Sequence, residues 1–245
     1  MNDNLAVSSE YNNLPRLTFF QRITGVIFTP GRLMADLEQK PRVLFGIILT
    51  LIVPMISIFA AFPMFKEYFR NATEATLAAT NQANQMTPEM LDSYVDVMAI
   101  ASPFLGSVSI GVVLLVEALV VWVVFKLLKG QGTFKHYLSI FSYTSVISLL
   151  ATIPFIIVTQ LTGSYADVSY TSLAALIPEM KGSFIYGMAK SFDVFNIWMY
   201  IVISIGIVTV SKLSKKKVYI IIACTFIALA LVAGFSEVRA AAAMM

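Results

Sequence analysis

The sequence predicts an all-α fold: a polytopic membrane helical bundle with five transmembrane helices and an N-terminal amphipathic, interfacial segment. Composition is the first observation behind this prediction, because 58% of the 245 residues are hydrophobic and 13% are charged, whereas soluble domains carry about 25% charged residues. The second observation is a set of five long apolar stretches. The third is that Lys and Arg concentrate in alternate polar segments between those stretches.

The five apolar stretches each have a length that suits a bilayer-crossing helix, about 17 to 25 residues. Backbone amides inside lipid have no water to bond, so each stretch is predicted to be a helix with internal hydrogen bonds. No polar segment is long enough for a separate soluble domain of ordinary size. Residues 1–15 are predicted to be a disordered tail and residues 236–245 an outer C-terminal tail. The predicted spans are 43–62, 104–125, 138–159, 194–211 and 218–235.

Residues 16–42 predict two short helices before the first span. Apolar residues recur at close to helical spacing in the first half of this segment, and Thr18 with Gln21 matches a capping box. Thr29-Pro30 predicts the start of the second helix, which Pro41 closes. Two placements are open: helices lying in the inner headgroup region, or helices packed on the inner face of the bundle.

The outer segments carry weaker signals. Pro63–Pro103 is acidic and begins with a stretch rich in Asn, Gln, Thr and Ala. Thr87 followed by Pro88 then predicts a helix start within it. The second outer segment, Gln160–Asp193, predicts one short helical piece near Leu173–Met180.

The distribution of basic residues predicts the orientation. Twelve of the 17 Lys and Arg residues lie in segments 1–42, 126–137 and 212–217. Cytoplasmic loops carry the excess of these residues, so the N-terminus is predicted inside and the C-terminus outside. The net charge of +3 fits contact with anionic lipid and not nucleic-acid binding. The inner basic residues are Arg16, Arg22, Arg32, Lys40, Arg42, Lys126, Lys129, Lys135, Lys212, Lys215, Lys216 and Lys217.

Glu117 is a candidate polar site because it lies near the middle of the second span. A charged side chain at a span centre costs about 2.5–3.5 kcal/mol on insertion scales. This carboxyl is therefore expected to face the bundle interior, to pair, or to stay protonated. Two interpretations are open: a proton, cation or substrate contact, and a protonated carboxyl bonded to hydroxyls of the third span. Pro54 and Pro154 predict kinks in the first and third spans, which serve gating or are packing irregularities.

The sequence carries no pattern for catalysis or cofactor binding. Gly130-Gln131-Gly132 lacks the third Gly and the Lys-Ser/Thr pair of phosphate-binding loops, and predicts a tight turn. The single cysteine and single histidine, Cys224 and His136, cannot make a four-ligand zinc site. The spans offer no acid/base pair of carboxylates. We therefore expect no enzymatic activity, no cofactor, no metal and no nucleic-acid partner.

Ile27-Phe28-Thr29-Pro30 precedes the first stretch, Gly130-Gln131-Gly132-Thr133-Phe134 leads into the third, and Asp193-Val194-Phe195-Asn196-Ile197-Trp198 opens the fourth. In this order the motifs resemble the Yip family of Rab-GTPase-interacting membrane proteins, and particularly its bacterial branch. This resemblance covers about residues 19–235 and implies a five-span bundle with a cytoplasmic N-terminus. Eukaryotic members are non-enzymatic partners of GTPases, but this chain lacks their long N-terminal region, and bacteria have no Rab system. The matching residues are Pro30, Gly130, Gly132, Phe134, Tyr143, Asp193, Phe195, Trp198 and Gly206.

The resemblance implies an accessory or scaffolding component of the bacterial cytoplasmic membrane, with some relatives linked to ABC-type exporters. Its expected partners are the lipid bilayer and other membrane proteins or further copies of itself. The alternative is a subunit of a transporter or channel that uses Glu117 and the kinked spans. The expected contact surface is a basic cytoplasmic face, made of Lys126, Lys129, Lys135, Lys212, Lys215, Lys216 and Lys217.

Overall fold

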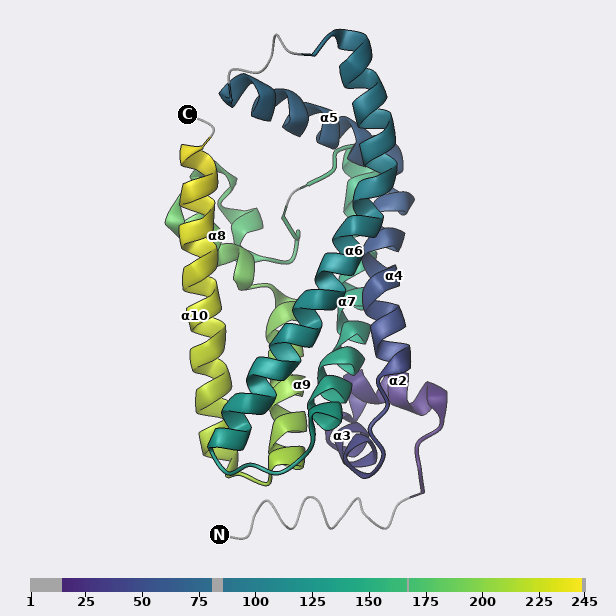
Figure 1. Cartoon of the computed structure of the whole chain (residues 1–245), viewed down its shortest axis with the longest axis vertical. Coiled ribbons are helices and arrows are strands. Elements are labelled where there is room, and N and C mark those ends of the chain that lie inside the picture. Colours follow the sequence, from purple (N-terminus) through teal and green to yellow (C-terminus); the bar gives the residue numbers. More distant parts are fainter. Residues whose placement is uncertain (1–14, 81–85, 167, 244–245) are drawn as a thin grey trace. The chain divides into compact units, whose positions relative to one another are not determined.

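The computed structural model describes residues 15–80, 86–166 and 168–243, and these ranges are mainly helical (Figure 1). The all-α prediction is confirmed, since the described residues form no β-structure beyond one isolated bridge between Ser172 and Asp193. The predicted N-terminal tail lies outside them except for Pro15. The elements are α2 (Phe19–Phe28), α3 (Pro30–Gln39), α4 (Leu44–Ala60), α5 (Phe62–Ala79), α6 (Pro88–Leu127), α7 (Phe134–Thr162), η2 (Leu173–Leu176), η3 (Pro178–Met180), α8 (Phe184–Ser191), α9 (Val194–Ser211) and α10 (Lys215–Ala242).

The apolar stretches correspond to helices α4, α6, α7, α9 and α10. Of these, α6, α7, α9 and α10 are long and apolar enough to cross a membrane individually. Helix α4 has 17 residues, which gives a length of about 26 Å. It is followed after one residue by α5, bent from it by 90°, and the pair together qualifies as a further span.

Two stretches of helix extend beyond the sequence prediction. Helix α6 has 40 residues, about 60 Å, or roughly twice the thickness of a bilayer's hydrocarbon core. The sequence separated its polar first part from the second span at Pro103, but the helix continues through that proline, as membrane helices often do. Helix α10 likewise runs to Ala242, so most of the predicted outer tail is helical.

The described chain divides into two compact units. Unit 1 comprises Met1–Ile52, Ser109–Leu150 and Phe195–Phe226. Unit 2 comprises Val53–Val108, Ala151–Val194 and Ile227–Met245. Since α4, α6, α7 and α10 each contribute residues to both units, each unit is built from segments distant in sequence.

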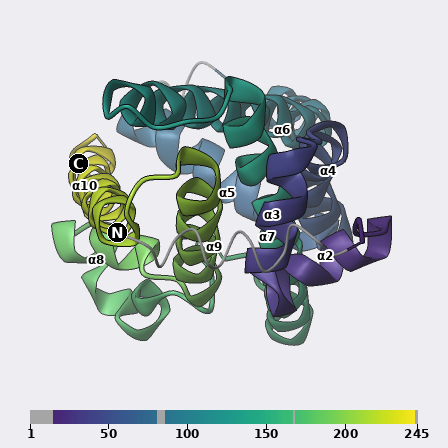
Figure 2. The ribbon, with the colours of Figure 1, turned by 90° about the horizontal axis from the view of Figure 1, so that it is seen from below.

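Helices α2 and α3 pack on the other helices of unit 1 (Figures 1 and 2). The side chains of Val26, Leu33 and Met34 are fully buried, in one apolar cluster with side chains of α7 and α9. This is one of the two placements that the sequence left open. Phe20 and Phe28 on α2 are 76% and 77% exposed, so this helix also presents aromatic side chains outward.

The predicted starts of these two helices are confirmed, at Thr18 for α2 and at Thr29-Pro30 for α3. Thr18 and Gln21 form the predicted capping box at the start of α2. Thr29 makes no side-chain cap hydrogen bond, so α3 begins with Pro30 at its first position instead of a capping hydroxyl. Pro30 suits that position because it lacks the N–H that would have no helical partner there.

A buried ion pair joins α2 to α3. Arg22 Nε lies 2.7 Å from Asp36 Oδ2, and the two residues are only 4% and 6% exposed. The other carboxylate oxygen accepts a hydrogen bond from the Leu17 backbone N–H at 3.2 Å, and the guanidinium also donates to the Leu17 carbonyl. Both charged groups are thereby compensated inside the unit, which is the condition for burying them without a large desolvation cost.

Two glycines allow the helices of unit 1 to approach closely. A Cβ atom at Gly206 of α9 would lie 2.7 Å from Ile140 Cγ2 and 2.8 Å from Met34 Sδ. At Gly46 of α4, a Cβ atom would lie 2.3 Å from the backbone of Ser142 in α7. Small residues at such crossings permit the backbone approach on which helix packing in membranes depends.

Unit 2 contains a helical hairpin that the sequence did not predict. Helix α5 and the first part of α6 are joined by the ion pairs Lys66–Asp96 and Arg70–Asp92. The rings of Phe69 and Tyr94 also stack with centroids 6.4 Å apart. Polar composition therefore did not exclude regular structure in this segment, because the charged residues pair across the two helices.

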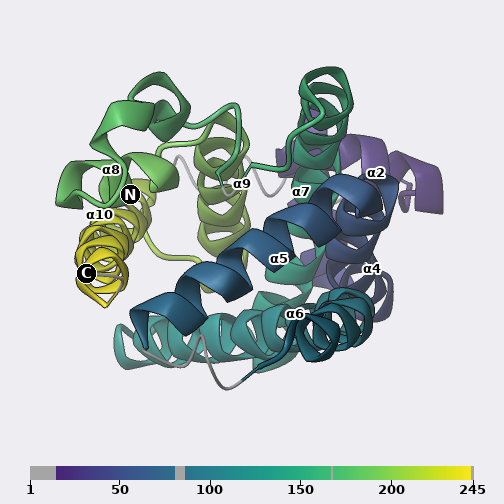
Figure 3. The same cartoon turned by 90° about the horizontal axis from the view of Figure 1, so that it is seen from above.

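Helix α8 packs beside α10 in unit 2 (Figures 1 and 3). A Cβ atom at Gly187 would lie 2.6 Å from the Ala233 carbonyl, so the two backbones are in contact. Lys190 Nζ lies 2.7 Å from Glu237 Oε2, and Glu237 also accepts from the Gly182 backbone N–H. The predicted piece at Leu173–Met180 is present as the short 3₁₀ turns η2 and η3, whereas α8 was not predicted.

The close packing at Gly206 leads to a first prediction. Gly206→Ala should destabilise the chain by about 1–3 kcal/mol, because the added methyl overpacks the contact with Ile140. Gly106→Ala is the matched control, since a Cβ atom there meets nothing within 4 Å. Gly106→Ala should be as stable as the parent or slightly more stable, because alanine loses less conformational entropy than glycine when the helix forms. Thermal unfolding in a mild detergent measures the stability of both variants. Equal changes in stability at the two positions would contradict the close packing at Gly206.

Candidate functional site

Three segments of unit 1 meet at the turns that join its helices (Figure 2). The α6–α7 turn and the α9–α10 turn are linked by the Gln131 N–H, which donates to the Ser211 carbonyl at 2.9 Å. The end of α3 reaches both turns through Glu38. Its carboxylate pairs with Lys212 at 2.5 Å, and its carbonyl lies 3.0 Å from His136 Nε2. These contacts form one connected surface from three distant parts of the sequence.

This surface carries the lysines of the predicted basic face. Six of the seven are exposed, and Lys212 is partly buried beside Glu38. Among the described residues, the basic face is therefore a set of exposed lysines around the Lys212–Glu38 ion pair. Its members come from the end of α6, the start of α7, the α9–α10 turn and the start of α10, namely Lys126, Lys129, Lys135, Lys212, Lys215, Lys216 and Lys217.

Two of these lysines occupy a left-handed backbone conformation. Lys129 has φ 65° and Lys212 has φ 57°, in a region that costs a non-glycine residue about 1–2 kcal/mol. At Lys129 the geometry is a Schellman motif, with the Gly130 N–H bonded to the Phe125 carbonyl and the Lys129 N–H to the Lys126 carbonyl. Glycine is the usual residue at this position, so each turn holds a strained lysine where glycine would fit better.

His136 caps the start of α7. Its Nδ1 accepts a hydrogen bond from the Thr133 backbone N–H at 3.2 Å, in the way that a Glu or Gln does in a capping box. Its Nε2 then carries the proton that is donated to the Glu38 carbonyl. The histidine thus fixes the end of α3 to the start of α7 and has a structural role in this surface.

The family-motif residues of unit 1 are packing and turn positions. Gly132 has φ 85° and its Cβ atom would lie 2.3 Å from Val210 Cγ1, so only glycine fits the turn against α9. Phe134 packs on Trp122 with ring centroids 6.1 Å apart. The others begin helices or lie in or against the apolar cluster of unit 1: Pro30, Gly130, Tyr143, Phe195, Trp198 and Gly206.

Tyr143 connects the motif to the buried ion pair. It is 2% exposed, its ring lies 6.0 Å from that of Phe45, and its hydroxyl hydrogen-bonds the Arg22 guanidinium. Sequence reasoning counted Arg22 only as an inner charge and did not identify Asp36. The sequence did contain a signal for the burial of Arg22, because Arg22 lies on the same helical face as the apolar residue Val26.

Asp193, the motif residue in unit 2, organises the loop that follows α7. Its carboxylate accepts hydrogen bonds from Ser169 Oγ at 2.7 Å and from Thr171 Oγ1. The backbones of Thr171–Leu173 and Phe192–Val194 are also bonded to each other. The residue therefore ties the start of α9 to the loop that follows α7.

Glu117 lies on an exposed part of α6 within unit 1. Among the titratable groups, Tyr200 on α9 interacts with it electrostatically. The hydroxyls of Ser142, Thr144 and Ser145, which the sequence offered as its partners, bond instead to the Ser139 carbonyl, the Phe141 carbonyl and Thr50. The structure thus directs these three span-three hydroxyls away from Glu117, and the group that interacts with it electrostatically is the phenol of Tyr200.

The described residues contain no group of three or more His, Cys, Asp and Glu side chains that could hold a metal ion. Cys224 lies exposed on α10 as a free thiol. The chemistry that the residues of the basic face offer is therefore electrostatic, between lysine ammonium groups and anionic surfaces.

The left-handed lysine leads to a second prediction. Lys129→Gly should stabilise the chain by roughly 1 kcal/mol, because glycine adopts this φ without strain. Lys126→Gly removes the same charge from the last turn of α6 and should destabilise the chain by about 0.5–1 kcal/mol. Thermal unfolding of both variants at one ionic strength separates backbone strain from charge. Destabilisation by Lys129→Gly would contradict the claim that the backbone of Lys129 is strained.

Comparison with known proteins agrees with this architecture. The chain is 31% identical over 107 residues to the membrane protein YknW of Bacillus subtilis, an alignment that covers 44% of this chain and 46% of that protein. The matched part thus spans about half the length of this relative. No solved structure matches the chain. The family model of the Yip1 domain matches residues 24–236, which includes nearly the whole helical part, and the chain therefore belongs to the Yip1 domain family.

Proposed function

We propose that this integral membrane protein acts without catalysis, as an accessory or scaffolding component, through helix–helix and membrane-surface contacts. The observation that carries the proposal is the placement of the family-motif residues. In unit 1 they form turns, helix starts and close contacts near the basic face, and in unit 2 Asp193 orders the loop after α7. The motif residues do not surround a reactive group among the described residues. Selection on such residues would preserve a surface, which is the requirement for a protein that works by contact.

The membrane-surface part of the proposal concerns the basic face. We place it on the cytoplasmic side of a bacterial membrane, with the N-terminus inside and the C-terminus outside, because Lys and Arg predominate in inner loops. A basic residue near an anionic membrane surface contributes about 1 kcal/mol of attraction. Lys129 and Lys212 both have a strained left-handed backbone conformation. Such strain persists at positions where the side chain has a function, and this supports a function for the two lysine side chains.

The helix–helix part of the proposal concerns contacts that α6 makes with other helices in the plane of the membrane. The outward face of α6 is apolar, and only 17% of its most apolar segment is buried within the chain. Gly106 lies on this helix with open space where a Cβ atom would project. An exposed glycine on an apolar span permits close approach of a second helix, so we propose that α6 contacts another membrane protein or a second copy. An ABC-type exporter is a candidate partner by family analogy alone.

A third prediction tests the lateral contact. Gly106→Leu should reduce cross-linked partner or dimer formation in native membranes, because the larger side chain blocks close approach at α6. Val112→Leu, at another exposed position of α6, is the control and should leave the cross-links unchanged. Recovery of the parent chain alone and monomeric, both in mild detergent and in native membranes, would contradict the scaffolding function.

A fourth prediction tests the membrane-surface contact. The full chain in neutral lipid nanodiscs should bind anionic vesicles of phosphatidylglycerol at low salt. Replacing Lys215, Lys216 and Lys217 together by Gln should weaken that binding by about tenfold or more, since each lysine contributes about 1 kcal/mol. Cosedimentation measures the loss, and Lys181→Gln in the outer loop serves as control. If the triple variant binds as well as the parent, the lysines act only in setting orientation.

The alternative function, as a transporter or channel subunit, has one specific observation in its favour. Glu117 lies within the most apolar part of α6 and interacts electrostatically with Tyr200, and an ionisable residue inside a span suggests a functional site. A fifth prediction separates the two functions. Proton flux into liposomes loaded with a pH dye should be the same for the parent, Glu117→Gln and empty liposomes. Flux that requires Glu117 would favour the transporter.

A further inference from the structure

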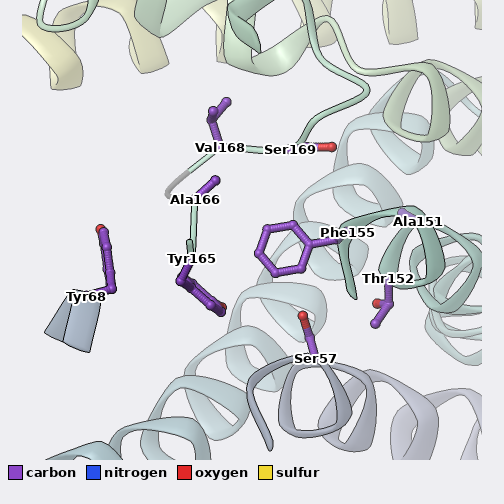
Figure 4. Close-up of a pocket in the computed structure, with 9 residues that line it drawn as sticks. All are labelled: Ser57, Tyr68, Ala151, Thr152, Phe155, Tyr165, Ala166, Val168 and Ser169. Carbon is purple, nitrogen blue, oxygen red and sulfur yellow. The ribbon is translucent and has the colours of Figure 1, made fainter. Parts of the chain in front are cut away.

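An open pocket lies within unit 2 (Figure 4). Its volume is about 400 Å³, within the range of about 300–1,000 Å³ that is usual for small-molecule sites. Helices α4, α5 and α7 and the loop after α7 contribute its walls. The lining residues are Ser57, Tyr68, Ala151, Thr152, Phe155, Tyr165, Ala166, Val168 and Ser169.

The bend between α4 and α5 creates this space. Helix α5 leaves α4 at 90°, so the last turns of α4 and α7 are not covered by a continuing helix on that side. Gln160 Nε2 of α7 donates to the Ala60 carbonyl at 2.7 Å and holds the two helix ends together. Two of the lining positions on these helices carry small side chains, Ser57 and Ala151, which leave volume unfilled beside Phe155.

Aromatic rings form the opposite wall. The ring of Tyr165 lies 5.2 Å from those of Phe65 and Phe155 and 5.5 Å from that of Tyr68, measured between centroids. Phe155 in turn contacts Tyr170 at 5.7 Å. These mutual contacts hold the rings in place, so the wall exists before any ligand arrives.

The lining residues that the structure describes carry no charged side chain. Their polar groups are hydroxyls, including those of Ser57, Thr152 and Ser169. Burial, and secondarily the neighbouring Tyr68, raise the pKa of Tyr165 to about 12. Because this raised value keeps the phenol neutral throughout the physiological range, none of the described lining residues offers a charge to a phosphate or an ammonium group. It suits an apolar chain with neutral hydrogen-bonding groups.

The pocket lies where such a molecule is abundant. Ser57 is within the last turn of α4, and Phe155 is in the last third of α7, so both are close to the ends of apolar stretches. Tyrosines gather at this depth in membrane proteins, at the boundary between hydrocarbon and headgroups. The glycerol esters of a bilayer lipid occupy the same boundary, between an apolar chain and a polar headgroup.

We propose that this pocket binds one membrane glycerolipid, through its glycerol ester region and the first part of one acyl chain. The aromatic wall packs on the chain, and the hydroxyls of Ser57 and Thr152 face the ester oxygens. The charged headgroup stays outside the pocket, so recognition is independent of headgroup charge. This binding is separate from the basic face and does not rest on the proposed scaffolding function.

The test uses the full chain in nanodiscs and a phosphatidylcholine with a photoactivatable diazirine near the ester end of one chain. After irradiation, mass spectrometry should find the label in the 165–169 segment and on α7 near Ala151. Ala151→Phe and, independently, Ala166→Phe fill the pocket and should reduce the label at 165–169 by about tenfold, equivalent to about 1.4 kcal/mol of binding. Ile153→Phe, at an exposed position of α7, is the matched control and should retain the label.

A competition experiment on the unmodified chain makes the test independent of whether the filled variants fold. Unlabelled phosphatidylcholine and unlabelled phosphatidylglycerol should displace the label equally and saturably. Label at 165–169 that persists in both filled variants, or that no unlabelled lipid displaces, would overturn the proposal. Displacement by phosphatidylglycerol alone would also overturn it, because it would require recognition of the charged headgroup.

Discussion

The buried pair of Arg22 and Asp36 is the interaction on which the arrangement of the basic face depends. A guanidinium and a carboxylate are costly to bury, and they are tolerated only when their hydrogen-bonding groups find partners. Here Asp36 accepts from Arg22 and from the Leu17 backbone, while Arg22 also contacts Tyr143. These bonds set the angle between α2 and α3, and that angle brings Leu33 and Met34 into the apolar cluster of unit 1.

The position of α3 determines which groups of the neighbouring turns form contacts with it. Met34 packs where Gly206 leaves room on α9. Glu38, at the end of the same helix, reaches both Lys212 and His136. The Yip-family motif thus contains, in unit 1, residues that let a short helical hairpin close over two tight turns and, in unit 2, Asp193, which ties the start of α9 to a loop. Its glycines provide backbone proximity, and the lysines beside them provide charge.

Much of this arrangement could be predicted from the sequence, because it depends on local rules. Apolar length predicted the long helices, Thr18 with Gln21 predicted a helix start, and the glycines at 130 and 132 predicted a tight turn. The Arg22–Asp36 pair could not be predicted in that way, since it depends on the angle between two helices. The same holds for the pocket at Tyr165, because it exists only where α5 turns away from α4.

The central claim is that the ion pair holds α3 in place and thereby organises the basic face. The most direct measurement is the amine reactivity of Lys212, read by mass spectrometry in Arg22→Met, Asp36→Leu and the double variant. Each single variant leaves one buried charge without its partner, so α3 should loosen, release Glu38 and raise the labelling of Lys212. The double variant should remain close to the parent, because an apolar pair can replace a buried ion pair. Unchanged labelling in the single variants, or additive effects in the double variant, would contradict this account.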